Sequence, residues 1–548
     1  MVIGAGAFTY VPGGADWIRI LPELIMLAAA LLVLLADLAG ASTRKGWLAY
    51  LGLLGVIGAG VATGALYQAQ NYHGAFFDMV TSDRAALLAD MIILFAVGLG
   101  LLFSPGYIER QGIRQPGEYY ALMLLAAFGM MFMASATNLM IIFVGLEVLS
   151  LSLYVLSAYV VGRARSQEAG LKYFILSSFA SGFLLYGMAL TYGSTGSTSL
   201  VGIRSFLNTH TFATGSGFGP LLLAGLGLMT VGFCFKVSAI PFQAWTPDVY
   251  VGAPTSVTAF MSAGTKVAAF VAFARVFMVA LHPVASQWTP VVWLVAVITM
   301  IGGNFMAVAS RDVKRMLAYS SIANAGYLLV AIVTDTQLSL ASLLVYLAAY
   351  AAMNVGAFGV VLAVERNSGL GTTLDDFAGL ARRTPWLAFA MLIFLCSLAG
   401  VPATVGFAGK WYIFYAAIVG HHLELAIIGL VSSVLGMFYY LRVVWAMYFT
   451  EPRAEAAPTS AFAIAPAAAP ALAAPSGAAG VAGVAVAEKV ATAPAVQMAG
   501  TQTAGALPAI PIATAFALGL AAVLTVALGI VPGGLYHIAT EAARALLP

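Results

Sequence analysis

The sequence predicts an all-α protein that crosses a membrane about fourteen times, with two of the crossing helices broken in mid-span. Of its 548 residues, 62% are hydrophobic and only 8% are charged. A soluble protein of this length needs many more charges to cover its surface. Apolar runs long enough to cross ~30 Å of hydrocarbon recur along nearly the whole chain. One of these runs contains a proline and several glycines near its middle, and another runs directly into a proline.

The composition also excludes several classes of function. The formal net charge is only +3, and the basic residues fall in short loops, which argues against nucleic-acid binding. The two cysteines, Cys234 and Cys396, lie in apolar runs, so neither a disulfide framework nor a CxxC metal site is expected. The N-terminal segment lacks the basic region of a signal peptide, so we expect the first span to be retained.

The predicted spans are apolar runs separated by short polar loops. They lie near residues 20–39, 47–67, 85–104, 119–135, 138–161, 169–192, 220–240, 253–281, 289–309, 314–333, 338–364, 386–419, 423–449 and 509–531. Alternate loops are rich in Arg and Lys, as at Arg44 and Lys45 or at Arg163 and Arg165, whereas the intervening loops are poor in both. Because cytoplasmic loops carry the excess of positive charge, both termini are predicted outside and the turn "WTPDVY" inside.

Four segments follow from this pattern. Residues 1–450 form a bundle of thirteen spans, 451–508 a linker, 509–531 the last span and 532–548 a short tail. Residues 453–507 are rich in Ala and Pro and predict a disordered cytoplasmic linker. A weak helix in part of it is the alternative, since alanine favours helix, but the recurrent prolines oppose it. The tail is compatible with a short interfacial helix.

The two proline-containing spans predict broken helices around Pro241 and Pro402. A helix over 386–419 would be roughly 51 Å long at 1.5 Å per residue, too long for one straight crossing. A break frees backbone polar groups that lipid cannot satisfy, so it belongs inside the protein or against water. Paired breaks also suggest two halves related as an inverted structural repeat, a hypothesis that no residue-level repeat supports.

Few ionisable residues fall at mid-depth in the spans. They are Glu147, Lys172, Lys236, Lys266 and Lys410. A charge at the bilayer centre costs at least ~2.5–3.5 kcal/mol, so such residues are candidates for function. Lys172 lies closer to a span end, where reaching out to the headgroups is an equal alternative. A structural pair with Glu147 would explain one lysine but would leave the others unpaired.

Lysine suits proton transfer because burial favours its neutral form and a nearby carboxylate favours its charged form. Arginine holds its proton too tightly for this task. A break beside Lys236 would supply polar lining and water around a titrating group. Glu23 and Asp37, near span ends, are interpreted as solvated, and Asp90 is left open between a solvated and a buried role.

The stretches around these charges resemble a known family. "GLEVLSLSLYVL", "EAGLKYFILSSFASGFLLYG", "FKVSAIPFQAWTPDVYVGAPTSVTAFMSAGTKVAAF", "SRDVKRMLAYSSIANAGY" and "GVPATVGFAGKWYIF" resemble the antiporter-like membrane subunits of respiratory complex I. The resemblance covers nearly all of residues 20–450 and the last span. Lys410, where the subunit M type usually has glutamate, and the short segment after 531 favour the subunit N type over the M and L types.

The resemblance implies a proton-translocating subunit without a redox centre of its own. It implies that Glu147 and Lys236 form a switching pair, that Lys172 modulates the pair, that Lys266 is the central relay and that Lys410 lies nearest the outward exit. NADH, FMN, iron–sulfur clusters and quinone would belong to partner subunits. The neighbours would be an M-type antiporter-like subunit and small membrane subunits, in a bacterial cytoplasmic membrane.

Two departures and two alternatives accompany this interpretation. Gln243 stands where the family often has histidine, and glutamine cannot titrate, so a relay step at that position is in doubt. Residues 453–507 are also longer than the usual connection. The first alternative is a cation/proton antiporter subunit without a link to NADH. The second is a structural scaffold, in which the mid-depth lysines would be replaceable.

Overall fold

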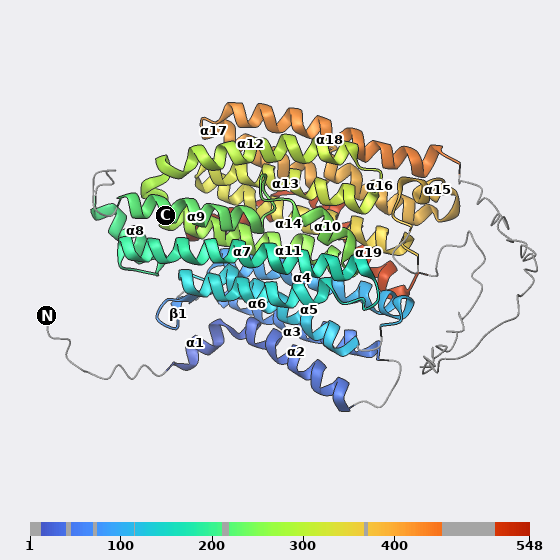
Figure 1. The fold of residues 1–548 in the computed structure, drawn as a ribbon, viewed down its shortest axis with the longest axis horizontal. Coiled ribbons are helices and arrows are strands. Elements are labelled where there is room, and N and C mark those ends of the chain that lie inside the picture. Colours follow the sequence, from blue (N-terminus) through green and yellow to red (C-terminus); the bar gives the residue numbers. More distant parts are fainter. Residues whose placement is uncertain are drawn as a thin grey trace, which may run out of the picture. The chain divides into compact units, whose positions relative to one another are not determined.

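A computed structural model of the chain describes residues 12–39, 45–69, 74–113, 116–210, 219–366, 371–451 and 510–547. Nearly all of the described chain is helical, and thirteen of its helices are long and apolar enough to span a membrane. In Figure 1 the long helices lie side by side along the horizontal axis. The predicted all-α polytopic membrane fold is therefore confirmed.

The long helices follow the predicted spans closely. They are α2 (Leu21–Ala39), α3 (Trp47–Ala69), α4 (Arg84–Gln111), α5 (Pro116–Ser135), α6 (Leu139–Ser157), α7 (Ala164–Thr195), α9 (Gly219–Lys236), α11 (Thr255–Ala274), α12 (Ala285–Ala309), α13 (Val313–Thr334), α14 (Gln337–Val364), α18 (Leu423–Phe449) and α19 (Ile512–Ile530). A π-helical turn, Arg275–Ala280, continues α11.

The shorter elements lie mainly at the ends of the bundle. They are α1 (Gly14–Arg19), α8 (Leu200–Thr209), α10 (Trp245–Gly252), α15 (Leu380–Arg383), α16 (Pro385–Ala399), α17 (Val405–Val419), α20 (Gly533–Leu546) and an antiparallel hairpin of β1 (Gly74–Ala75) and β2 (Val80–Thr81). We call the end with β1, β2 and α8 the hairpin end, and the end with α15 the opposite end (Figure 1). By the predicted orientation the hairpin end is the outer one.

Three helices form the centre of the bundle. Every residue of α11 is buried, and α13 and α14 are buried along nearly their whole length. Helices that are apolar on all sides belong in such a position. Small residues bring neighbouring backbones close: a Cβ added at Gly129 of α5 would lie 2.6 Å from the Leu149 nitrogen of α6.

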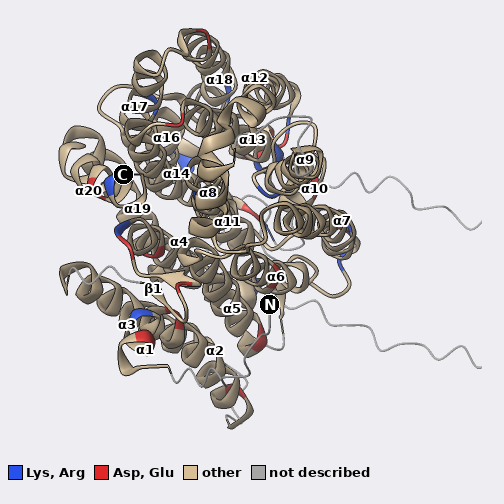
Figure 2. Ribbon diagram, turned by 90° about the vertical axis from the view of Figure 1, so that its left-hand side faces the viewer, with Lys and Arg blue, Asp and Glu red and all other residues tan. Residues whose placement is uncertain are grey.

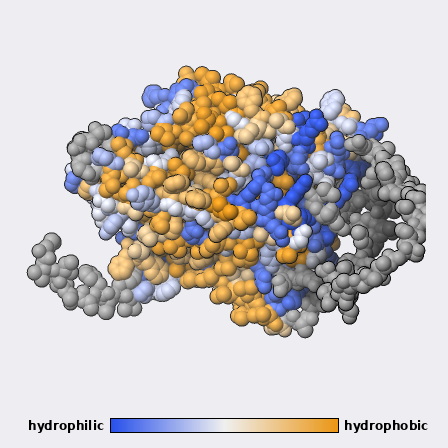
Figure 3. Space-filling model, in the orientation of Figure 1, coloured by the Kyte–Doolittle hydropathy of each residue, from blue (hydrophilic) through white to orange (hydrophobic). Residues whose placement is uncertain are grey.

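Charged residues are sparse on the helices and gather near their ends. In Figure 2, which looks along the long helices, Lys, Arg, Asp and Glu are few among the other residues. Figure 3 shows hydrophobic residues across the middle of the visible face, with hydrophilic residues concentrated toward the right, on the side of α15. A band of exposed apolar side chains is what lipid requires of a spanning bundle.

Both predicted helix breaks are present. The first separates α9, which ends at Lys236, from α10, which begins at Trp245. The second separates α16 from α17, and Gly400 adopts a left-handed φ of +87° there. Because α16 and α17 have only 15 residues each, the predicted total of fourteen requires that they make one crossing together. That count and the inverted repeat stay predictions.

The remaining expectations have mixed outcomes. The β1–β2 hairpin and α8 were not predicted, since short loops give little periodic signal. The tail does form a helix, α20, which packs against α4 and α14 and pairs Glu541 with Arg84 at 2.7 Å. The predicted linker, residues 453–507, lies outside the described residues.

Candidate functional site

Three of the predicted site lysines lie deep inside the bundle. Lys236, Lys266 and Lys410 are 2%, 1% and 6% exposed. None of them lies within ion-pair distance of a carboxylate among the described residues. Such burial leaves no path for their side chains to the headgroups, so each ammonium group depends on the polar atoms around it.

Lys236 is hydrogen-bonded to a serine of α6, the helix that also carries Glu147. The Lys236 Nζ donates to Ser150 Oγ at 2.8 Å and to the Tyr173 hydroxyl at 3.4 Å. Ser150 lies one turn after Glu147 on α6, and the charge of Glu147 acts on Lys236. The Glu147 Oε1 atom is buried without a hydrogen-bond partner in the described chain. Lys236 and Glu147 therefore make no direct ion pair in the described chain.

The break after Lys236 is lined by polar contacts. The Trp245 indole donates to the Phe235 carbonyl at 3.1 Å, and Trp245 stacks on Tyr173 with ring centroids 4.6 Å apart. The Ile240 amide donates to Thr299 Oγ1 at 3.0 Å. Side chains thus satisfy backbone groups that the break has released from helical pairing.

Lys266 lies in the fully buried helix α11. Its Nζ donates to the Ser321 carbonyl of α13 and lies 5.4 Å from the centre of the Tyr350 ring. The hydroxyls of Ser321 and Tyr350 and the Oε1 atom of Gln243 are buried without described partners. Polar atoms left open in this way are the partners that a buried water molecule requires.

Lys410 lies beside the second break and binds its backbone. Its Nζ donates to the Leu398 carbonyl at 2.8 Å, to the Ala399 carbonyl at 3.4 Å and to Ser433 Oγ at 2.8 Å. The Tyr327 ring centre is 5.0 Å away. The two carbonyls end α16, where the helix dipole places partial negative charge that stabilises a cation.

Uncharged polar side chains fill the space between Lys266 and Lys410, and sequence reasoning missed them. Ser320 hydrogen-bonds Tyr440, and Tyr346 donates to Asn324. Further along, Asn304 accepts from the Tyr439 hydroxyl at 3.0 Å and donates to the Tyr327 hydroxyl at 3.2 Å. The signal available in the sequence was the pair of serines and the asparagine in "SSIAN", within an otherwise apolar run.

Lys172 occupies a different environment. Its side chain is 41% exposed and pairs with Glu168 at 2.6 Å and with Asp248 at 2.7 Å. Asp248 also accepts from Arg315 at 3.1 Å, beside a polar pocket of about 260 Å³. The structure therefore places Lys172 at the edge of the bundle, and only its neighbour Tyr173 contacts Lys236.

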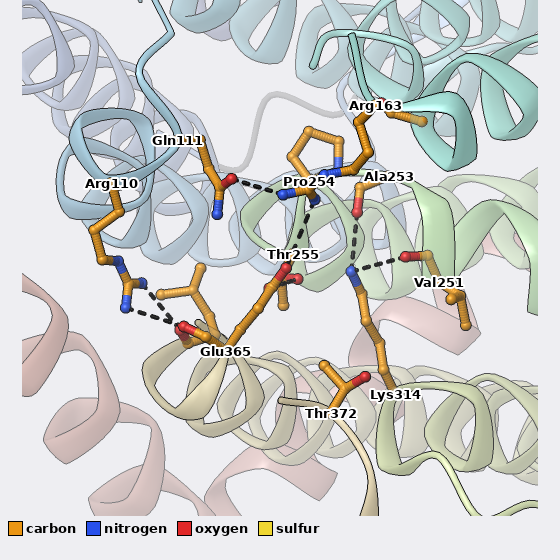
Figure 4. A network of polar contacts seen from close by, with 12 residues as sticks. Arg110, Gln111, Arg163, Val251, Ala253, Pro254, Thr255, Lys314, Glu365 and Thr372 are labelled. Carbon is orange, nitrogen blue, oxygen red and sulfur yellow. Dashed lines mark hydrogen bonds and ion pairs between the residues drawn. The ribbon is translucent and has the colours of Figure 1, made fainter. Parts of the chain in front are cut away.

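A polar network closes the opposite end of α11 (Figure 4). Glu365, which ends α14, is 2% exposed and accepts a hydrogen bond from Thr255, the first residue of α11. The guanidinium of Arg163 lies 3.8 Å from the Glu365 carboxylate and donates to Gln111 at 2.6 Å. Sequence reasoning treated Arg163 as a loop charge and did not single out Glu365, although the structure buries Glu365 and leaves the Arg163 side chain only 16% exposed.

Two further cations of this network bind backbone carbonyls. Arg110 donates to the Leu362 carbonyl at 3.0 Å, and Lys314 donates to the Ala253 carbonyl at 2.9 Å. Both carbonyls lie near the C-terminal ends of helices, where cations are stabilising. The network therefore holds together the C-terminal ends of α4, α10 and α14 around the start of α11, the helix that carries Lys266.

The described residues contain no group of three or more His, Cys, Asp or Glu side chains that could hold a metal ion.

Comparison with known proteins agrees with this arrangement. Residues 136–436 match the family model described as NADH:quinone oxidoreductase/Mrp antiporter, TM. The chain belongs to this family. It is 45% identical to NADH-quinone oxidoreductase subunit N of Trichlorobacter lovleyi, over 78% of this chain and 87% of that one. It is 44% identical to NADH-quinone oxidoreductase subunit N 1 of Herpetosiphon aurantiacus, over 83% and 91% of the two chains. The resemblance seen in the sequence is confirmed.

Solved structures share the family fold. A chain of respiratory complex I from Thermus thermophilus with bound aureothin superposes with a TM-score of 0.70 at 29% identity, covering 94% of this chain and 98% of that one. A chain of the Mrp complex from Dietzia superposes with a TM-score of 0.76 at 22% identity, covering 97% and 99%, which supports the fold alone.

Proposed function

We propose that this chain is the subunit N type, proton-translocating membrane subunit of an NADH-quinone oxidoreductase. The observation that carries the proposal is the row of three buried lysines without carboxylate ion pairs, joined by polar side chains. A buried ammonium that lacks a counter-ion is costly, whereas a buried neutral amine is not. Lysines placed in this way take up and release protons readily.

Each site residue has one role in the proposed path. Glu147 and Lys236 form a pair that switches between a closed ion pair and the open arrangement, with Ser150 between them. Lys172, tied to Asp248, adjusts the charge around this pair. Lys266 relays the proton, with Gln243 or water bridging the gap from Lys236, and Lys410 is the group nearest the outer side.

The proposed path from Lys266 to Lys410 uses hydroxyls and amides. Ser320 and Tyr440, and then Tyr439, Asn304 and Tyr327, supply donors and acceptors along the way. Hydroxyl groups can both give and accept a proton, so they connect sites that do not touch. The network around Glu365 restricts access from the opposite end of α11.

The chain itself does no redox chemistry in this proposal. NADH, FMN, iron–sulfur clusters and quinone belong to partner subunits, and the driving signal arrives through an M-type antiporter-like subunit and small membrane subunits. The setting is a bacterial inner membrane, with both termini on the outer side, which the sparse Lys and Arg of the hairpin-end loops support.

A native gel tests the assignment. Membranes dissolved in mild detergent are separated, stained for NADH dehydrogenase activity and probed for this chain. Comigration with a very large active band supports the proposal. Migration in a smaller band without NADH activity contradicts it and favours the second candidate, a cation/proton antiporter subunit, which the description of the matching family also covers. Sodium/proton exchange in vesicles then becomes the assay.

A further inference from the structure

Each of the three mid-depth lysines has its Nζ near the ring of a buried tyrosine. The distances from Nζ to the ring centre are 5.6 Å for Lys236 and Tyr173, 5.4 Å for Lys266 and Tyr350, and 5.0 Å for Lys410 and Tyr327. The tyrosines come from three different helices, α7, α14 and α13, and are at most 2% exposed. The face of an aromatic ring attracts a cation at such distances, most strongly where water is excluded.

The other lysines that the structure describes have partners of another kind. Lys45 and Lys172 pair with carboxylates at the edge of the bundle. Lys314 is 2% exposed, as deeply buried as the mid-depth lysines, but its Nζ donates to the Val251 and Ala253 carbonyls at the opposite end. The tyrosine rings therefore accompany the lysines at mid-depth, where neither water nor a carboxylate ion pair balances the charge.

Lys266 depends on its ring more than the other two lysines do. Its Nζ has one hydrogen-bond acceptor in the described chain, the Ser321 carbonyl. By comparison, the Nζ of Lys236 has two acceptors, and the Nζ of Lys410 has three. An ammonium group carries three N–H donors, so a charged Lys266 needs a further stabilising group.

Tyr350 offers Lys266 its ring and not its hydroxyl. Lys266 lies on α11, every residue of which is buried, and Tyr350 lies midway along α14 and is fully buried. The Tyr350 hydroxyl has no hydrogen-bond partner in the described chain, whereas the Lys266 Nζ lies over the ring. The electrostatic contact between the two side chains therefore comes from the aromatic face.

We propose that the Tyr350 ring is the neutral counter-group of Lys266 and stabilises its ammonium form while the lysine carries a transferred proton. A carboxylate in this place would hold that proton much more firmly. An aromatic ring supplies a smaller attraction, so the lysine can both accept the proton and pass it on. Tyr350 is thus a positioning residue for the proton carrier, and this inference rests on the proposed proton-translocating function.

The experiment varies the charge distribution of the ring but not its shape. In the assembled complex, Tyr350 is replaced by phenylalanine and then, by nonsense suppression, by phenylalanines that carry one, two or three fluorine atoms. Fluorine withdraws electron density from the ring face and weakens its attraction for a cation. Proton pumping per NADH oxidised should stay within about twofold of wild type in Tyr350→Phe, and should fall stepwise with each fluorine, to roughly tenfold lower.

The matched control is Phe358, which is also fully buried on α14 but faces an aromatic side chain, Tyr250, at 6.0 Å. The same fluorinated residues at position 358 should leave pumping unchanged. Tyr350→Leu removes the ring and should lower pumping roughly tenfold. If that variant fails to assemble, the fluorinated series still tests the ring, because it preserves the packing.

Two outcomes overturn the inference: pumping that does not follow the number of fluorine atoms, or a loss in Tyr350→Phe as large as in the trifluorinated variant. The first would show that the ring is only a packing element, and the second that the hydroxyl is the active group.

A failure of the proposed function gives a different result. Wild-type pumping in Lys266→Ala would contradict the lysine path itself. The contact between lysine and ring is then tested without pumping, by the heat resistance of complexes at mildly acidic pH, which favours the ammonium form. Trifluorination at position 350 should lower heat resistance less when Lys266→Met is also present, because no cation remains above the ring. Equal losses with and without Lys266→Met would overturn the inference.

Discussion

The two helix breaks each hold a buried lysine, but they hold it in different ways. At the first break Lys236 is the last residue of α9, and its Nζ turns to Ser150 on another helix, next to Glu147. At the second break Lys410 lies on the second half-helix, and its Nζ turns back to the Leu398 and Ala399 carbonyls of the first.

This difference separates a switchable site from a fixed one. The contacts of Lys236 are side-chain hydroxyls, and the charge that acts on it is that of the Glu147 carboxylate, which can move, titrate and respond to neighbouring charges. The counter-groups of Lys410 are backbone carbonyls, whose dipoles stay in place whatever the protonation of their surroundings. We therefore expect signals from partner subunits to act at Lys236, and the structure around Lys410 to depend on the lysine itself.

Lys410→Ala gives the largest expected effect, because it removes both a proton carrier and a structural contact. Proton pumping should fall at least about tenfold. The Leu398 carbonyl at the end of α16 would also lose its donor, which costs about 1–3 kcal/mol of stability, whereas the Ala399 carbonyl keeps Ser433. Native gels of complexes heated in steps measure the loss of assembly. Normal heat resistance in an assembled Lys410→Ala complex would contradict the fixed role of this site.

Lys236→Ala should lower pumping to a similar degree but leave assembly and heat resistance close to wild type. The carbonyl of the preceding residue, Phe235, still accepts a hydrogen bond from the Trp245 indole, so this backbone group at the break stays paired. Lys236→Arg is the matched variant: it retains the charge but cannot release the proton, so it should also fail to pump. Wild-type pumping in an assembled Lys236→Ala complex would remove this residue from the path.

Glu147→Gln tests whether the first site is switched by its carboxylate. The amide keeps the shape of the side chain but removes a charge that acts on Lys236. We expect pumping to fall roughly fivefold, equivalent to about 1 kcal/mol of lost electrostatic interaction. Reconstituted vesicles with a pH-sensitive dye measure the rate. Unchanged pumping would mean that the Glu147 carboxylate does not control Lys236, so the proposed difference between the two breaks would be lost.

The sequence predicted this contrast only in part. Pro241 and Pro402 fixed the breaks because proline cannot continue a helix in lipid without compensation, and the lysines stood out because mid-depth charges are rare. Which atoms each Nζ would contact depended on packing between α6 and α9 and between α16, α17 and α18. No local pattern encodes those contacts.

The buried polar residues that the sequence did not reveal share one physical cause: their partners come from distant parts of the chain. Position within a span suggested that Glu23 is solvated, but it is buried, and the hairpin packs against the flanking residues Ile20 and Leu24 from outside the apolar run. Glu365 sits in a charged loop segment, yet Thr255 and Arg163 converge on it from distant parts of the chain. Asn304 and Tyr439 look ordinary in single helices and matter only where three helices, α12, α13 and α18, bring them together with Tyr327.

The smallest expected effects come from the two serines that bind the lysines, and they sharpen the comparison. Ser433→Ala removes one of three hydrogen bonds to Lys410, whose carbonyl contacts remain, so pumping should change less than about twofold. Ser150→Ala removes the shortest contact of Lys236, which comes from the helix that carries Glu147, and pumping should fall about threefold. Equal effects of the two substitutions, measured in the same vesicle assay, would show that Ser150 does not mediate the opening of the Glu147–Lys236 pair. A larger effect of Ser150→Ala is expected if backbone carbonyls hold Lys410, whereas mobile side chains hold Lys236.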